Sequence, residues 1–161
     1  MRIPILTYHS LNARGTDYDS NDHDALELDL TLLKENGFRV ERLTTLVDAF
    51  NSGQADDYEG EKVCAITFDD GVTHDFVDFY HPDRGLLKSF ARILAEATDS
   101  SRVGWAKVPA TSFVIVSPDA RDILDVQCIA GRNQWHHHWW EEAIRVAHFD
   151  IGNHSWDHTH P

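Results

Sequence analysis

The sequence predicts an α/β fold in which parallel strands alternate with covering helices. Apolar, β-rich runs at 63–68 and 111–116 are typical of strands buried on both faces. Helical patterns separate such runs at the spacing of βαβ units, and this alternation favours a parallel sheet. The chain has 161 residues, of which 42% are hydrophobic and 25% charged, so we expect one folded domain over 1–161.

The first elements follow from apolar spacing and capping residues. A short strand is expected at 3–8, although Pro4 weakens its first half. Asn21 and Asp22 can cap a helix that ends at Gly37. The apolar face of this helix consists of Leu26, Leu30 and Leu33.

Alternating apolar and charged residues at 38–43 predict a second strand. Thr44 or Thr45 can cap the helix that follows, and a polar loop is expected at 52–61 before the strand at 63–68. The residues expected to face inward from this second helix are Leu46, Val47 and Phe50.

The second half continues the alternation of strands and helices. An irregular stretch at 72–84 precedes a helix at 85–97, and the strand at 111–116 precedes a short helix that begins at Pro118. A loop, a helix at 135–148 and a last strand at 149–153 complete the series. The loop contains Cys128, Gly131 and Asn133, and the helix should bury Trp139, Ala143 and Val146.

Charge and composition exclude several classes of protein. The net charge of −13 argues against nucleic-acid binding and against docking to anionic lipid. No apolar run approaches the ~20 residues of a membrane span, and the N-terminus lacks the pattern of a signal peptide. We therefore expect a cytoplasmic protein by default, or an extracellular one if an upstream segment is missing. Cys64 and Cys128 are expected to be buried free thiols.

Two adjacent carboxylates follow the clearest strand. Asp69 and Asp70 precede Gly71 at its carboxyl end, the edge where parallel sheets bind ligands. At a break between strand and loop both side chains can face one pocket, where one can hold a cation and the other can act as a base. The alternative interpretation is an ordinary polar turn.

A second polar cluster, His154-Ser155-Trp156-Asp157-His158, follows the last strand. His154 and His158 would meet on one face if this segment formed a helical turn. Together with one aspartate they would supply three ligands and leave open positions, which is typical of catalytic zinc and also suits Fe(II). The alternative is a histidine-rich surface loop.

Both motifs resemble those of the NodB-homology polysaccharide deacetylases, carbohydrate esterase family 4. Thr67-Phe68-Asp69-Asp70 resembles the first family motif, and the segment from His154 to His158 resembles the second. The resemblance implies that Asp69 is the catalytic base and that the metal ligands are Asp70, His154 and His158. It also implies hydrolysis of an N-acetyl or O-acetyl group on a glycan, with Zn²⁺ the expected metal and Co²⁺, Ni²⁺ or Fe²⁺ as alternatives.

The resemblance covers only the front half of the family domain. The family fold is a distorted (β/α)7 barrel, and this chain ends directly after the second motif, before the family's arginine and catalytic-acid segments. We therefore expect an incomplete barrel of parallel strands and outer helices, truncated on its C-terminal side. Open strand edges of such a half barrel favour association into a homo-oligomer.

Four further residues are candidates for substrate contacts: Tyr8, His9, Tyr80 and Trp156. A run of three histidines at 136–138, flanked by tryptophans, has three interpretations: a sugar platform, an accessory metal site, or a packed helix face with a solvated histidine start. Two other functions remain open. One is a non-catalytic metal-binding or glycan-binding module, and the other is a metal-dependent amidase that acts on a small non-sugar amide.

Overall fold

The computed structural model describes residues 2–99, 107–129, 131–147 and 149–159. Its main sheet has the parallel order β1-β3-β6-β7, and a short β2 also pairs with β3. The bounds of these strands are β1 Ile5–Tyr8, β2 Arg39–Val40, β3 Val63–Phe68, β6 Ala110–Val114 and β7 Phe149–Asn153. Within the described residues β1 and β7 each pair on one side, so the sheet does not close into a barrel.

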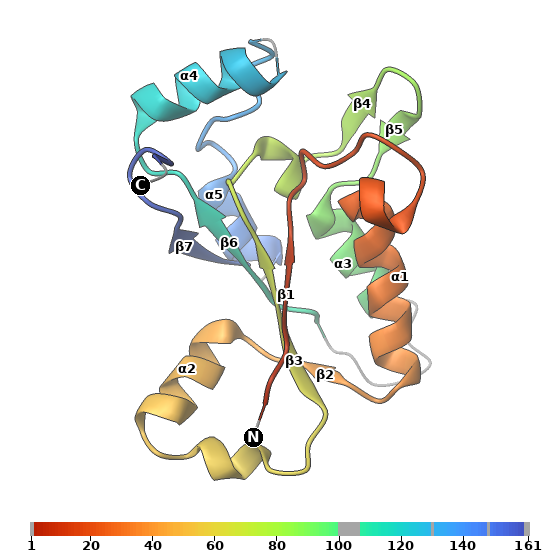
Figure 1. Ribbon diagram of the computed structural model, residues 1–161, viewed down its shortest axis with the longest axis vertical. Helices are drawn as coiled ribbons and strands as arrows, with labels where there is room; N and C mark the ends of the chain where they lie inside the picture. The colour runs from red at the N-terminus through yellow and green to blue at the C-terminus, as the bar shows by residue number, and fades with distance from the viewer. Residues whose placement is uncertain (1, 100–106, 130, 148, 160–161) are drawn as a thin grey trace.

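Helices lie on both sides of the strands (Figure 1). In that view α1 and α3 stand next to each other on one side of β1 and β3, α2 lies at the amino end of the sheet, and α4 lies beyond its carboxyl end. The helices are α1 Asp22–Glu35, α2 Leu43–Asn51, α3 Phe90–Asp99, α4 Pro118–Ile129 and α5 Trp140–Glu142, the last continued by a π-helical segment, Ala143–Ala147. Short 3₁₀ turns are formed by Tyr18–Ser20, Ala55–Tyr58 and Thr73–Asp75.

The core lies between the sheet and α1, α3 and α5. Phe68 at the end of β3 is fully buried, and its ring contacts those of Phe90 and Phe149 at centroid distances of 4.5 and 5.4 Å. All six residues of β3 are buried, as expected for the central strand of a parallel sheet. The register aligns the carboxyl ends of β1, β3, β6 and β7 at one edge of the sheet.

The strongest sequence patterns are confirmed. The strands at 63–68 and 149–153 have the predicted bounds, and the strand at 3–8 is shortened to Ile5–Tyr8. The first helix also begins and ends as predicted: the Asn21 side chain accepts hydrogen bonds from the first free amides, and Gly37 adopts φ 72°.

The predicted strand at 38–43 and the predicted helix at 85–97 are wrong in extent. The strand is limited to Arg39–Val40, because α2 already begins at Leu43. Residues 85–87 form β5 (Gly85–Leu87), which pairs in antiparallel fashion with β4 (Phe79–His81). The following helix starts only after Ser89, whose Oγ accepts the amide of Arg92 at 3.3 Å.

Burial corrects three further expectations. In α2 only Leu46 is buried, whereas Val47 and Phe50 are exposed. The helix from Pro118 runs for 12 residues and includes Cys128, which is exposed and not in a loop, while Cys64 is buried as predicted. The predicted helix at 135–148 becomes the short α5 and its π-helical continuation, in which Val146 is exposed; position 148 lies outside the described residues.

No helix in the described part of the chain combines the length and apolar character that a bilayer crossing requires.

Candidate active site

The two adjacent aspartates lie where β3 ends. The Asp69 amide still pairs with the Tyr8 carbonyl at 3.0 Å, so Asp69 continues the strand. Asp70 adopts φ 75°, in the left-handed region, and its carbonyl accepts a hydrogen bond from Trp135 Nε1 at 2.8 Å. This change of backbone conformation ends the strand's alternation, and it brings both carboxylates close to the same imidazole, that of His154.

Gly71 is required by both conformation and space. Its φ is 68°, and a Cβ atom at this position would lie 2.6 Å from Cγ1 of Val114. Only glycine therefore allows the turn after Asp70 to pass so close to β6.

The two histidines meet through a loop and not through a helical turn. Ser155 and His158 adopt left-handed φ values of 72° and 58°. The Ser155 hydroxyl accepts the amide of His158 at 2.9 Å, which closes the loop on itself. Outside it, the amides of Val116 and Ser117 donate to the carbonyls of Ser155 and Trp156 at 3.2 and 2.7 Å. The loop is thus anchored to the segment between β6 and α4.

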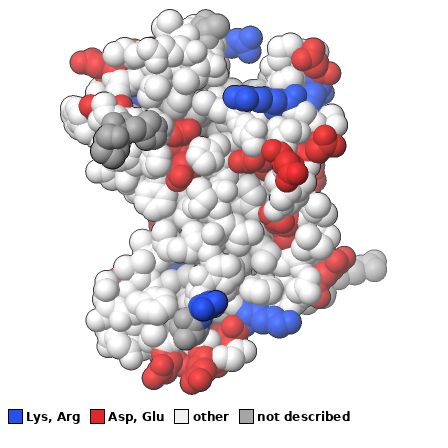
Figure 2. Space-filling model, viewed as in Figure 1, with Lys and Arg blue, Asp and Glu red and all other residues white. Residues whose placement is uncertain are grey.

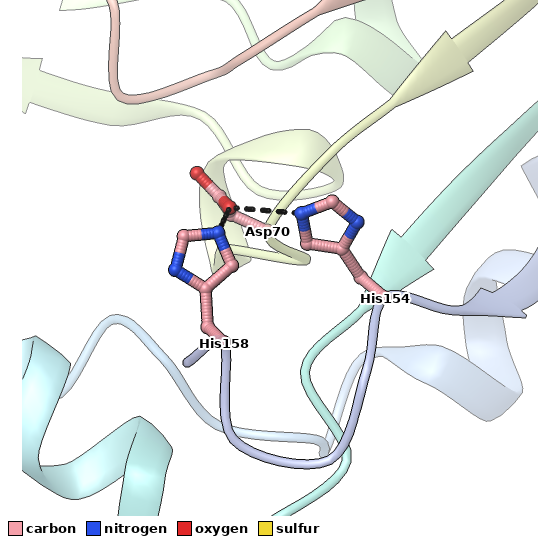
Figure 3. A group of neighbouring side chains, drawn as sticks. All are labelled: Asp70, His154 and His158. Atoms are coloured by element: carbon pink, nitrogen blue, oxygen red, sulfur yellow. Dashed lines mark ion pairs between the residues drawn. The ribbon is translucent and has the colours of Figure 1, made fainter. Parts of the chain in front are cut away.

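Asp70, His154 and His158 converge on one point (Figure 3). Oδ1 of Asp70 lies 3.6 Å from Nε2 of His154 and 3.4 Å from Nε2 of His158. In the described part of the chain, this is the one place where three such ligand atoms lie within 4.8 Å of one another. All three side chains remain partly accessible to solvent.

This group fits a divalent metal ion. The Asp70 Oδ1 atom is buried and has no hydrogen-bond partner among the described residues, which is costly unless a cation satisfies it. Ligands about 2.1 Å from a tetrahedral zinc lie roughly 3.4 Å apart. The two carboxylate–imidazole distances are close to that separation.

Asp69 lies directly beside this group. Its Oδ1 is 4.0 Å from Nδ1 of His154, and its Oδ2 is 3.9 Å from Nε2 of His9. The Asp69 side chain is 22% exposed, so it can be reached from solvent. Asp70 therefore belongs to the group of three converging side chains, and the carboxylate of Asp69 lies next to that group with access to solvent.

Asp75 is a buried acid near the site that sequence reasoning missed. Its carboxylate is fully buried and accepts hydrogen bonds from Ser10 Oγ at 2.6 Å and Ser112 Oγ at 2.7 Å. Burial, together with the charges of Asp70 and Asp69, raises its pKa to about 7, although the hydrogen bonds from the two hydroxyls act to lower it. No motif marks this position, because its two partners come from distant segments.

The four expected substrate contacts lie in different environments. The structure argues against a substrate contact by Tyr8. Its ring is 5% exposed and packs against Phe68 and Phe90, and its hydroxyl donates to Asp29 at 2.6 Å. His9 is exposed beside Asp69. Trp156 and Tyr80 are 64% and 74% exposed, the first in the histidine loop and the second on the β4–β5 hairpin.

The histidines at 136–138 match the packing interpretation. The flanking Trp135 and Trp139 are buried, while His137 and His138 are exposed. No accessory group of three metal-ligating side chains forms there within the described residues.

No protein-family model and no curated protein sequence matches the chain. Its fold does match solved structures. PplD, a deacetylase of Streptococcus pyogenes solved in complex with acetate, matches with a TM-score of 0.60 and 19% identity over 99% of this chain and 58% of its own. BC0361, a polysaccharide deacetylase from Bacillus cereus, matches with a TM-score of 0.60 and 19% identity over 99% of this chain and 40% of its own.

A third structure, a de-N-acetylase from Aggregatibacter actinomycetemcomitans, matches with a TM-score of 0.54 and 18% identity over 94% of this chain and 54% of its own. The chain thus spans about half the length of the solved deacetylases that it matches. The expected fold is confirmed: this is the α/β deacetylase fold in an incomplete form, without a closed barrel in the described residues.

Proposed function

We propose that this chain carries the metal centre and the catalytic base of a deacetylase that hydrolyses N-acetyl, or O-acetyl, groups on a glycan. One observation carries the proposal: Asp70, His154 and His158 converge at the carboxyl edge of the sheet with Asp69 beside them. Similarity in fold to solved deacetylases, one of them a polysaccharide deacetylase, supports the same reaction class.

Asp70, His154 and His158 would hold the metal, and zinc is the first choice because two imidazoles and one carboxylate would leave a position open. Cobalt, nickel and iron(II) suit the same donors. When bound, such an ion supplies a Lewis acid that polarises the acetyl carbonyl and lowers the pKa of water.

Asp69 is the proposed general base. Its carboxylate is solvent-accessible and is not one of the three converging ligands, so it is available to take a proton from the attacking water. His9, at 3.9 Å, is placed to orient this carboxylate or to contact the substrate next to it. The exposed ring of Trp156 offers a flat apolar face beside the site for a pyranose.

The experiment measures zinc binding by this chain and acetate release by the protein isolated from its natural source. The intact mass of the isolated protein is measured first. Wild-type protein should bind one zinc and release acetate from an acetylated oligosaccharide. Asp69→Asn should keep zinc and lose roughly 10²–10⁴-fold in acetate release, the usual contribution of a general base. Asp70→Ala should lose both, and Asp48→Asn on the exposed side of α2 should lose neither.

Other outcomes would redirect the assignment. Undiminished activity in Asp69→Asn would show that the base is misassigned. Stoichiometric zinc without acetate release from any substrate would indicate a non-catalytic metal-binding or glycan-binding module. Turnover of small amides but not of glycans would indicate an amidase on the same fold. Association through the open edges of β1 and β7 stays a prediction, which light scattering checks.

A further inference from the structure

A second cavity opens at the same end of the sheet as the candidate active site. It has a volume of about 560 Å³ and lies between three parts of the chain: the loop at 10–14 after β1, β4 with the adjoining Pro82, and the C-terminal end of α4 at 127–129 with Arg132. These segments surround the carboxyl edge of the sheet in Figure 1. The cavity is large enough for a pyranose ring and its substituents.

The charge of this cavity is opposite to that of the whole protein. Its lining includes the cationic side chains of Arg14 and Arg132 and no aspartate or glutamate, in a chain of net charge −13. Figure 2 shows basic side chains at this end of the molecule, near α4 and the β4–β5 hairpin. Neither arginine forms an ion pair with any carboxylate that the structure describes, although most basic side chains elsewhere do.

The two arginines differ in this respect from structural arginines nearby. Arg84, on the β4–β5 hairpin, forms an ion pair with Asp24 at 3.0 Å and donates to the Gly15 carbonyl, so its charge is already neutralised by a carboxylate. Arg14 and Arg132 are exposed and keep their charge available to a ligand. Guanidinium groups bind carboxylates and phosphates through paired hydrogen bonds.

Aromatic surface lines the same cavity. The His74 ring stacks on Phe79 at a centroid distance of 3.7 Å and an interplanar angle of 14°, and the neighbouring Tyr80 is 74% exposed. Burial, the nearby His23 and the charge of Arg132 together lower the pKa of His74 to about 4, so this ring is neutral and adds apolar surface. Flat rings beside two guanidinium groups suit a sugar ring that carries a negative substituent.

Two consecutive residues of the chain border the candidate active site and the cavity. Ser10 lines the cavity and donates to the buried Asp75, and the preceding His9 lies 3.9 Å from the carboxylate of Asp69. A glycan that places an acetyl group at Asp69 can therefore extend along the loop after β1 into this cavity.

We infer that this cavity binds an anionic sugar residue, one that carries a carboxylate or a phosphate, adjacent to the acetylated residue of the substrate. The inference rests on the proposed function and deepens it, because it selects charged acetylated glycans over neutral ones. The oxyanion meets Arg14 and Arg132, and the exposed ring of Tyr80 contacts the face of the sugar.

The test is a comparison of binding affinities in the Asp69→Asn background, so that the substrate is not consumed. Three oligosaccharides of equal length serve as probes. The first is an N-acetylglucosamine oligomer, the second alternates N-acetylglucosamine with N-acetylmuramic acid, and the third is the N-acetylglucosamine oligomer with a 6-phosphate. At least one anionic probe should bind about tenfold or more tightly than the neutral one. The advantage should shrink between about 0.01 M and about 1 M salt, over which the screening length falls from about 30 to about 3 Å.

Matched variants assign the effect to the cavity. Arg14→Gln combined with Arg132→Gln should remove the advantage of the anionic probes and leave the affinity for the neutral oligomer unchanged. Arg2→Gln, an exposed arginine before β1 at the other end of the sheet, should change none of the three affinities. Tyr80→Ala should weaken all three probes to a similar degree, because ring contact does not depend on charge.

Two results would overturn the inference: equal affinity for the neutral and both anionic probes, or an anionic advantage that survives replacement of both arginines. Both are independent of turnover. Failure of the proposed function would instead appear as absent acetate release from the wild-type protein, while the arginine-dependent binding could still be measured.

Discussion

Replacing Asp75 by asparagine tests the electrostatics beneath the candidate active site. The carboxylate is fully buried and contacts two serine hydroxyls, Ser10 and Ser112. Asparagine has nearly the same shape and can accept from one hydroxyl and donate to the other. The substitution therefore removes the charge of the ionised form and keeps the packing.

The sign of the pH dependence follows from the raised pKa. Burial, assisted by Asp70 and Asp69, raises the pKa of Asp75 from 3.8 to about 7. Between these two values the folded protein holds a proton that the unfolded chain releases, so the stability contributed by Asp75 falls as pH rises. The difference of roughly three pKa units corresponds to about 4 kcal/mol, an order-of-magnitude figure, at about 1.4 kcal/mol per unit.

Two buried histidines oppose this trend in the wild-type protein. Burial lowers the pKa of His74 to about 4 and also lowers the pKa of His23. In the unfolded chain these imidazoles take up protons below about 6.5, so their contribution to stability falls as pH decreases through that range. The pH profile of the wild-type protein alone would therefore hide the effect of Asp75, whereas its difference from Asp75→Asn isolates it.

The assay is urea unfolding of both proteins at steps between about pH 4 and pH 8, with a chelator present and linear extrapolation to water. Near pH 4 the free energies of unfolding should be similar. By pH 8 the Asn variant should be more stable, by up to about 4 kcal/mol. Zinc should reduce this gain, because a cation at Asp70 offsets the negative charges that raise the pKa of Asp75. A difference that stays constant with pH, or that grows in favour of the wild type, would refute the reasoning.

Three further predictions concern packing and accessibility. Gly71→Ala should lower the free energy of unfolding by about 2–4 kcal/mol, because its Cβ would lie 2.6 Å from Val114 at a left-handed φ, and a loss under about 0.5 kcal/mol in urea unfolding would contradict this. Cys128 should react with iodoacetamide in the native protein, while Cys64, buried with its pKa raised to about 11, should react only after unfolding; intact-mass analysis of the alkylated protein distinguishes the two. Tyr8→Phe should lose about 1–2 kcal/mol of stability with its buried hydrogen bond and leave glycan affinity unchanged, so a selective loss of glycan binding would restore Tyr8 as a substrate contact.

The sequence was most informative where one local pattern was sufficient to determine the structure. The six apolar residues at 63–68 have few alternatives to a central strand, and Asn21 and Gly37 bound the first helix because capping depends on residue type and immediate neighbours. The hairpin at Phe79–Leu87 could not be predicted in this way. Leu86 and Leu87 fit the face of a helix as well as a strand, and the choice depends on pairing with residues six or more positions away.

The candidate site shows the same limit at the level of single side chains. The motifs identified Asp69, Asp70, His154 and His158, and the structure brings all four together. Asp75 and the arginine-lined cavity had no local signal, because each is assembled from segments that are far apart in sequence. Residues whose role depends on what faces them across the fold need the structure to be found.

The loop at 154–158 shows how a motif can identify side chains that converge without indicating the conformation that brings them together. The i, i+4 spacing suggested a helical turn, yet His154 and His158 meet because left-handed φ values at Ser155 and His158 fold the segment back. That conformation is held from outside: the amides of Val116 and Ser117, between β6 and α4, donate to the loop's carbonyls. The relative positions of His154 and His158 therefore depend on a segment about forty residues earlier, which follows β6, the strand that pairs with β7. The motif indicates which side chains converge, and the register between β6 and β7 determines how they do so.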